Sequence, residues 1–279
     1  MKLLNCKKSI LVLAIFFLVI YPVYAANKII LVAPAYGIDQ MIEKFNQKTV
    51  SPEREQEYEK IRSHFIDMKD RGEISIPASL IKPSGHYASL DTETLARECF
   101  SGSYFANIMG VYATHEDVAF IRLRVFHDGF AELFSRSDMW KGILSVYKML
   151  VKNLDPKMAK IDIINTTTTL DSLTHLYFFP PFKEQLYGRE EIFLEANLEA
   201  LKRFKSFIEN YHPTGSMMKI PFYREPFSVA RVALMLQQRT NPQNYYAIIP
   251  DLAGVRFSSE QKTTDIKKYL DLVIPALEK

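Results

Sequence analysis

Apolar residues recur at intervals of three and four along much of this sequence, the spacing that places side chains on one face of an α-helix. The clearest case spans residues 52–71, where the apolar stripe consists of Tyr58, Ile61, Phe65 and Met68. Ser51 and Pro52 suit the cap and the first helical position, and Gly72 follows as a stop signal. This stretch therefore predicts one amphipathic helix with both ends marked.

The same spacing predicts further helices, among them short ones from Asp91 and from Ser137 to Leu150. The longest covers 190–211, with an apolar face made of Leu194, Leu198, Leu201, Phe204, Ile208 and Tyr211. Residues 227–236 are apolar on nearly all sides, so we expect a buried central helix there. The last predicted helix covers 261–278, and its inward face consists of Ile266, Tyr269, Leu270 and Val273.

Residues 118–134 fit two patterns. Alternation over 121–125 and the turn signal Asp128-Gly129 favour a strand and a hairpin. A helical stripe runs through the whole segment, formed by Ala119, Leu123, Phe126, Phe130 and Leu133. We expect a helix, in which Gly129 costs about 1 kcal/mol as an interior glycine or marks a kink.

Only short apolar runs, such as 28–34 and 245–250, suit strands. The prediction is a mainly α, multi-helix single domain over residues 26–279, with eight or nine helices and two or three short strands at most. A division near Asp155, where the chain reads Asp-Pro, is the alternative.

Residues 1–25 have the layout of a secretory signal peptide. Three lysines precede an apolar run from Ile10 to Ile20, and Val23-Tyr24-Ala25 suits cleavage after Ala25. We expect export, to the periplasm or the medium if the source is bacterial. The alternative is an uncleaved anchor, although the longer apolar stretch from Ile10 to Ala26 has only 17 residues, the short limit for a membrane span, and contains Pro22. Membrane association is expected only through such an anchor.

Removal of this segment changes the charge balance. Three of the 35 Lys and Arg residues lie in it, which leaves 32 against 32 Asp and Glu residues. A phosphate-binding surface needs clustered excess positive charge, so nucleic acid is not an expected partner. Cys99 is the single cysteine after cleavage, and we expect a buried, inert thiol rather than a disulfide or a nucleophile.

Residues that could carry chemistry are sparse. The six histidines are scattered without metal-ligand spacing, and no glycine-rich phosphate loop occurs, so neither a metal nor a cofactor is expected. The best catalytic candidates are Asp171 and His175, which are four residues apart and share a helix face with Thr167. An ordinary helix-stabilising pair explains the same spacing.

Two aromatic segments flank the 190–211 helix. Their rings and methionines suit a hydrophobic ligand or a protein partner. The candidate binding residues are Phe178, Phe179 and Phe182 in the first segment and Met217, Met218, Phe222 and Tyr223 in the second. The alternative is that both segments fold inward and close the core. The sequence therefore favours an exported helical binding protein over an enzyme, with an exported hydrolase using Asp171 and His175 as the alternative function.

Overall fold

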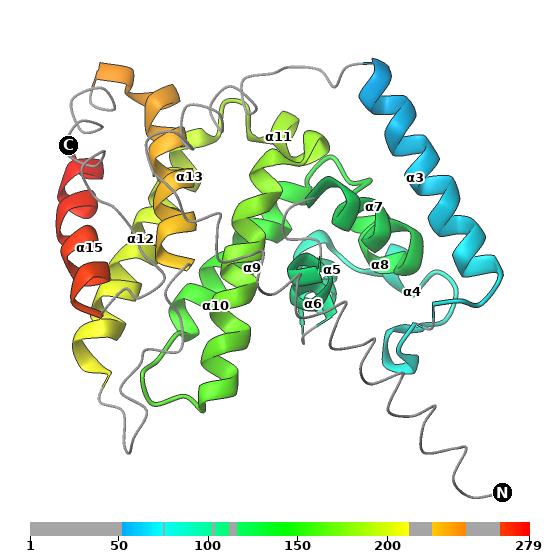
Figure 1. The fold of residues 1–279 in the computed structure, drawn as a ribbon, viewed down its shortest axis with the longest axis horizontal. Coiled ribbons are helices and arrows are strands. Elements are labelled where there is room, and N and C mark those ends of the chain that lie inside the picture. Colours follow the sequence, from blue (N-terminus) through cyan, green and yellow to red (C-terminus); the bar gives the residue numbers. More distant parts are fainter. Residues whose placement is uncertain (1–51, 75, 102–103, 112–115, 212–224, 244–262) are drawn as a thin grey trace, which may run out of the picture.

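The computed structural model describes residues 52–74, 76–101, 104–111, 116–211, 225–243 and 263–279 (Figure 1). These residues form twelve α-helices and two short 3₁₀ helices, and they contain no strand, so the mainly α prediction is confirmed. The predicted signal segment and the predicted strands at 28–34 and 245–250 lie outside the described residues. Within the described ranges, no helix has both the length and the apolar character needed to cross a membrane.

Most helices of the first half of the chain are short. Its α-helices are α3 (Pro52–Asp70), α4 (His86–Ser89), α5 (Thr92–Phe100), α6 (Tyr104–Val111), α7 (Glu116–Phe126), α8 (Asp128–Leu133) and α9 (Met139–Asn153). Of these, α3 and α9 are the two long ones. The second half contributes α10 (Lys160–His175), α11 (Pro180–Leu186), α12 (Glu190–Asn210), α13 (Glu225–Thr240) and α15 (Thr263–Leu277). The 3₁₀ helices are η1 (Ala78–Leu80) and η2 (Leu176–Phe178).

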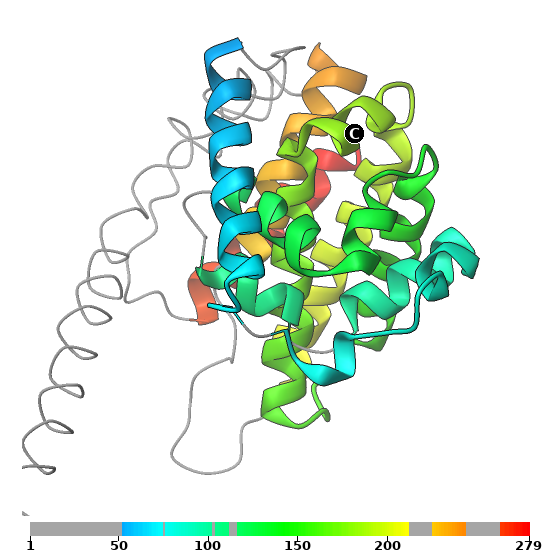
Figure 2. The same cartoon turned by 90° about the vertical axis from the view of Figure 1, so that its right-hand side faces the viewer.

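These helices pack as one body around one apolar core that extends from Tyr87 to Leu277. Figure 1 shows α12, α13 and α15 on one side, α9 and α10 in the middle, and α3 at the opposite edge. Helices before and after Asp155 share the core, since α9 packs against both α10 and α12. In Figure 2, α3 lies along the outside, where Phe65 packs against Phe126 of α7 with ring centroids 6.0 Å apart.

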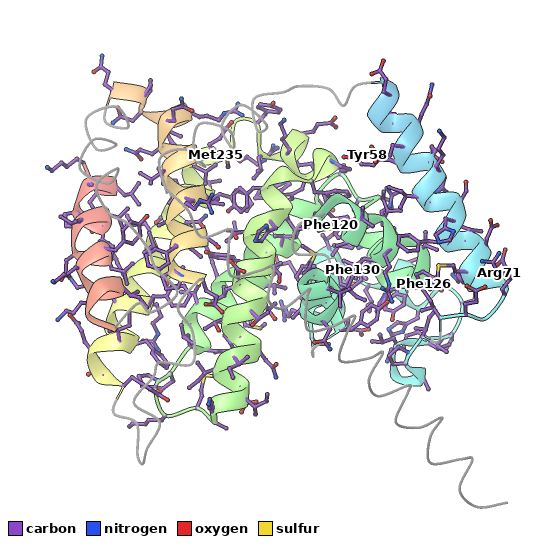
Figure 3. All side chains as sticks on the ribbon, in the orientation of Figure 1. Tyr58, Arg71, Phe120, Phe126, Phe130 and Met235 are labelled. Atoms are coloured by element: carbon purple, nitrogen blue, oxygen red, sulfur yellow. The ribbon has the colours of Figure 1, made fainter. Side chains whose placement is uncertain are left out.

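The expected central helix is confirmed as α13, which packs against α10, α12 and α15. Every residue from Val232 to Gln237 is buried, and Figure 3 shows Met235 among the packed helices. The inward face predicted for α15 is also confirmed, because Ile266, Tyr269, Leu270 and Val273 are all buried.

The predicted helix over 118–134 is divided in the structure at His127, whose backbone is extended (φ −138°, ψ 109°). Its side chain accepts a hydrogen bond from the backbone N–H of Phe130 and so caps α8. The kink expected near Gly129 is thus a complete break. All five members of the predicted stripe remain buried, and Figure 3 labels Phe126 and Phe130 on the two sides of the break.

The core face of α12 differs from the predicted one. Leu201, Phe204 and Ile208 are buried as expected, but Leu194 and Leu198 are only partly buried. The remaining core positions are Phe193, Ala196, Asn197, Ala200 and Phe207. The buried face of α12 therefore combines part of the predicted stripe with a second row that contains the small alanines, and this helix packs against α9 and α13.

Candidate functional site

The helix that carries the catalytic candidates, α10, is buried at its carboxyl end despite its threonines. The hydroxyl of each buried threonine bonds to a carbonyl of the helix itself: Thr167 donates to Ile164 at 3.2 Å, Thr169 to Asn165 at 2.8 Å and Thr174 to Asp171 at 2.6 Å. Threonine can therefore enter the core without leaving its hydroxyl unsatisfied.

Asp171 and His175 lie on one face of α10, as their spacing predicts. The Nε2 atom of His175 is 3.9 Å from Oδ1 of Asp171, which is longer than a hydrogen bond, and their side chains are 20% and 15% exposed. In the part of the chain that the structure describes, no three His, Cys, Asp or Glu side chains gather in a metal-binding group. The geometry is that of an ordinary i, i+4 contact on a partly buried helix face.

A buried polar network lies deeper in the same region. The hydroxyl of Tyr147 on α9 donates to the amide oxygen of Asn197 on α12 at 3.1 Å. The amide nitrogen of Asn197 donates to the hydroxyl of Tyr177 at 2.9 Å and to the carbonyl of Phe193 at 2.7 Å. Burial raises the pKa of both tyrosines, so their hydroxyls stay protonated. The sequence analysis missed this network because Asn197 is the only sign of it on an otherwise apolar face.

The first aromatic segment folds inward. Phe182 is fully buried, and its ring meets those of Tyr177 and Phe193 edge-on, with both centroid distances 5.6 Å. Phe179 is also buried and packs against Phe120 at 4.6 Å. The side chain of Phe178 lies outside the described part of the chain. So do the other binding candidates, namely Met217, Met218, Phe222 and Tyr223.

The buried Cys99 matches its predicted role. Its side chain is 2% exposed, and burial raises the pKa of the thiol, which keeps it protonated and unreactive.

A groove of about 450 Å³ lies between the first half of α12 and the end of α15. In Figure 1 these two helices stand side by side, on the side of the molecule opposite α3. Three leucines and three glutamates line the groove: Leu194, Leu198 and Leu277 with Glu191, Glu195 and Glu278. Leu194 and Leu198 are the half-buried leucines at the edge of the core face of α12. The groove thus combines buried or half-buried apolar side chains with exposed acidic ones.

Ion pairs join α12 and α15 at the groove, where Glu278 takes part, and beyond it. Lys202 Nζ is 2.7 Å from Glu278 Oε1, Lys205 Nζ is 2.6 Å from Asp271 Oδ1, and Lys267 Nζ is 3.3 Å from Glu209 Oε1. Lys202 and Lys205 of α12 therefore each pair with an acidic residue of or next to the neighbouring helix α15. Glu191 and Glu195, by contrast, project from the exposed surface of α12.

No family model matches this chain, and neither the characterised proteins nor the solved structures include a significant match to it.

Proposed function

We propose that this protein is an exported binding protein, and that the groove between α12 and α15 holds a protein segment carrying lysine or arginine beside apolar side chains. The observation that supports the proposal is the composition of the groove, which is lined by three buried or half-buried leucines and three exposed glutamates. Export is proposed on the signal-like pattern of residues 1–25.

The two kinds of side chain would act on different parts of the partner. Leu194 and Leu198 are partly exposed, so covering them with apolar groups removes apolar surface from water. Glu191 and Glu195 would attract cationic groups and orient the segment, since charges at the rim of an interface mainly govern steering and register. A volume near 450 Å³ is within the range of ligand clefts and accommodates a few side chains rather than a domain.

The aromatic segment that the sequence analysis favoured contributes less to this proposal. Phe179 and Phe182 are buried, and a partner could reach them only if the core opened. The catalytic alternative with Asp171 and His175 also gains no support, because their geometry is that of a plain helical contact.

The test uses the mature chain and a labelled helical peptide of leucine and lysine, with a leucine and glutamate peptide of identical pattern as the comparison. Fluorescence anisotropy gives the dissociation constants. We expect the lysine peptide to bind, with an affinity that falls as salt is added. The double variant Glu191→Lys/Glu195→Lys should raise Kd about tenfold, a change of about 1.4 kcal/mol.

The matched control is Glu55→Lys/Glu59→Lys on α3, which makes the same change in net charge at two exposed positions across the molecule. This control should leave Kd within about twofold. Leu198→Asn should weaken binding while keeping its salt dependence, because it removes apolar contact and no charge. The proposal fails if both peptides bind equally, or if the α3 variant weakens binding as much as the α12 variant.

A further inference from the structure

His127 occupies the break between α7 and α8 and is 3% exposed. Its Nδ1 atom lies 3.3 Å from the backbone nitrogen of Phe130 and accepts that hydrogen bond. An imidazole that accepts at Nδ1 carries its proton on Nε2, so the ring is neutral in this arrangement. The bond stands in for the aspartate, asparagine or serine that more often begins a helix.

Aromatic rings enclose this histidine. The ring centroids of Phe130, Tyr87 and Tyr104 are 5.0, 5.4 and 5.8 Å from that of the imidazole. Gly129 completes the enclosure, because a methyl group there would lie 2.8 Å from Cε1 of His127 and 3.0 Å from Sγ of Cys99. The ring is therefore held in place and screened from water.

Several ionisable groups lie near the ring or near the tyrosines that pack against it, and their charges partly oppose one another. They are Asp128 on α8, Glu98 and Cys99 on α5, His86 and Tyr87 on α4, Tyr104 on α6, Arg122 on α7 and Lys82 ahead of α4. Glu98 is already engaged, since its Oε2 is 2.9 Å from Nε2 of His86. Asp128 is exposed to solvent. Neither acid makes a hydrogen bond to the His127 ring.

We propose that His127 is an acid-sensitive latch, which holds α8 against α7 and α5 while neutral and releases the junction when it takes up a proton. Protonation places a hydrogen on Nδ1, where it faces the N–H of Phe130 instead of accepting from it. The new positive charge also lies at the amino end of a helix, where cations are unfavourable. Both effects act against the closed junction.

Release would uncover apolar surface. Phe130 and Phe134 on or beside α8 are buried in a ring cluster with Phe100, Phe105 and Phe120. Loosening α8 exposes the rings on both sides of this contact, so acid would create an apolar patch that is absent at neutral pH.

The pH range over which the junction should open follows from the direction in which the pKa of His127 is shifted. Burial lowers the pKa of His127 below its ordinary value of 6.5, while Asp128 acts in the opposite direction. The open junction, with the ring in water, therefore takes up the proton at a higher pH than the closed one. As pH falls from 6.5 towards the lowered pKa, the opening equilibrium grows by up to about tenfold per pH unit.

The test is hydrogen–deuterium exchange of peptides covering 116–134 in the full mature chain, from pH 7.5 to pH 5, with rates corrected for intrinsic exchange. We expect the corrected opening of the wild-type junction to rise below pH 6.5. His127→Asn keeps a capping acceptor that does not titrate, so its opening should stay flat. His86→Gln and the exposed-site variant His64→Gln are matched controls that should keep the wild-type pH dependence.

Titration of the His127 ring by NMR in the wild-type protein supplies a second readout that needs no variant to fold. The proposal predicts a pKa below 6.5 and exchange of the 116–134 region that follows the same titration. A ring pKa at or above 6.5 overturns the latch. So does a His127→Asn protein that opens with acid like the wild type, or a His86→Gln protein that no longer responds.

Discussion

Substitution of Gly142 by alanine tests how closely α9 approaches α5. A methyl group at this position would lie 2.6 Å from the carbonyl oxygen of Thr92 and 2.8 Å from the Cβ of Ala96. Carbon and oxygen atoms that are not bonded rarely approach so closely, so the two helices must separate or shift to admit it. Because the obstructing atom belongs to the backbone, a change of side-chain rotamer cannot relieve the contact.

Two free-energy terms of opposite sign act in the Gly142→Ala variant. Alanine is favoured over glycine inside a helix by about 1 kcal/mol, whereas overpacking a tight contact costs roughly 1–3 kcal/mol and sometimes more. The position of α5 is fixed locally, since Thr92 Oγ1 donates to Asp138 Oδ1 at 2.7 Å and Arg136 donates to the carbonyl of Leu90 at 2.7 Å. We therefore expect the upper part of that range and a net loss of about 1–2 kcal/mol.

A loss of this size should lower the melting temperature by roughly 2–8 °C in a chain of this length. Circular dichroism at 222 nm on heating measures the shift, and urea unfolding measures the free energy directly. Gly188→Ala is the comparison, because Gly188 has φ of 75° and nothing within 4 Å of an added methyl, so that variant carries backbone strain without a clash. A Gly142→Ala protein as stable as the wild type would refute the close approach of α5 and α9.

Two further predictions concern the buried ring of Phe182 and the signal-like segment at residues 1–25. Phe182→Ser should lower the free energy of unfolding in urea by about 3–5 kcal/mol, because the ring is fully buried among three helical elements. The control Ile81→Ser changes a side chain that is 65% exposed and should alter the stability little. Equal stability of the two variants would contradict the inward fold of the aromatic segment. If the protein is exported and cleaved, the intact mass of protein purified from its native host should equal that of a chain starting at Ala26. A full-length chain retained in the membrane would exclude cleavage.

Much of the fold could be predicted because its helices carry strong periodic stripes. The inward residues of α15, from Ile266 to Val273, were identified from spacing alone, and the end of α3 just before Gly72 was identified from that glycine. The stripe through Leu123 and Phe130 survives even though the helix breaks between them, since two helices continue the same buried face. Period and caps are local properties, which a sequence displays directly.

Other features depend on partners that lie far away in the sequence. Leu194 and Leu198 are as apolar as the fully buried residues of α12, yet they are only half-buried, whereas the small Ala196 and Ala200 lie in the core. Which positions are buried depends on how the neighbouring helices fit against α12. The break at His127 needs an imidazole in a rare capping role, with a ring cage drawn from other helices. The groove with its glutamates arises only when the end of α15 meets the start of α12.

The Tyr147–Asn197–Tyr177 network has a consequence for how this sequence can vary. Asn197 is 50 residues from Tyr147 and 20 from Tyr177 along the chain, yet it forms a hydrogen bond with each of them inside the core. Loss of either tyrosine hydroxyl removes a partner from the buried Asn197 amide, at roughly 1–3 kcal/mol, whereas replacing all three by apolar residues of similar volume costs little. Simultaneous substitution of all three residues is therefore tolerated better than substitution of one at a time. Homologous chains that differ at one of these positions should differ at all three.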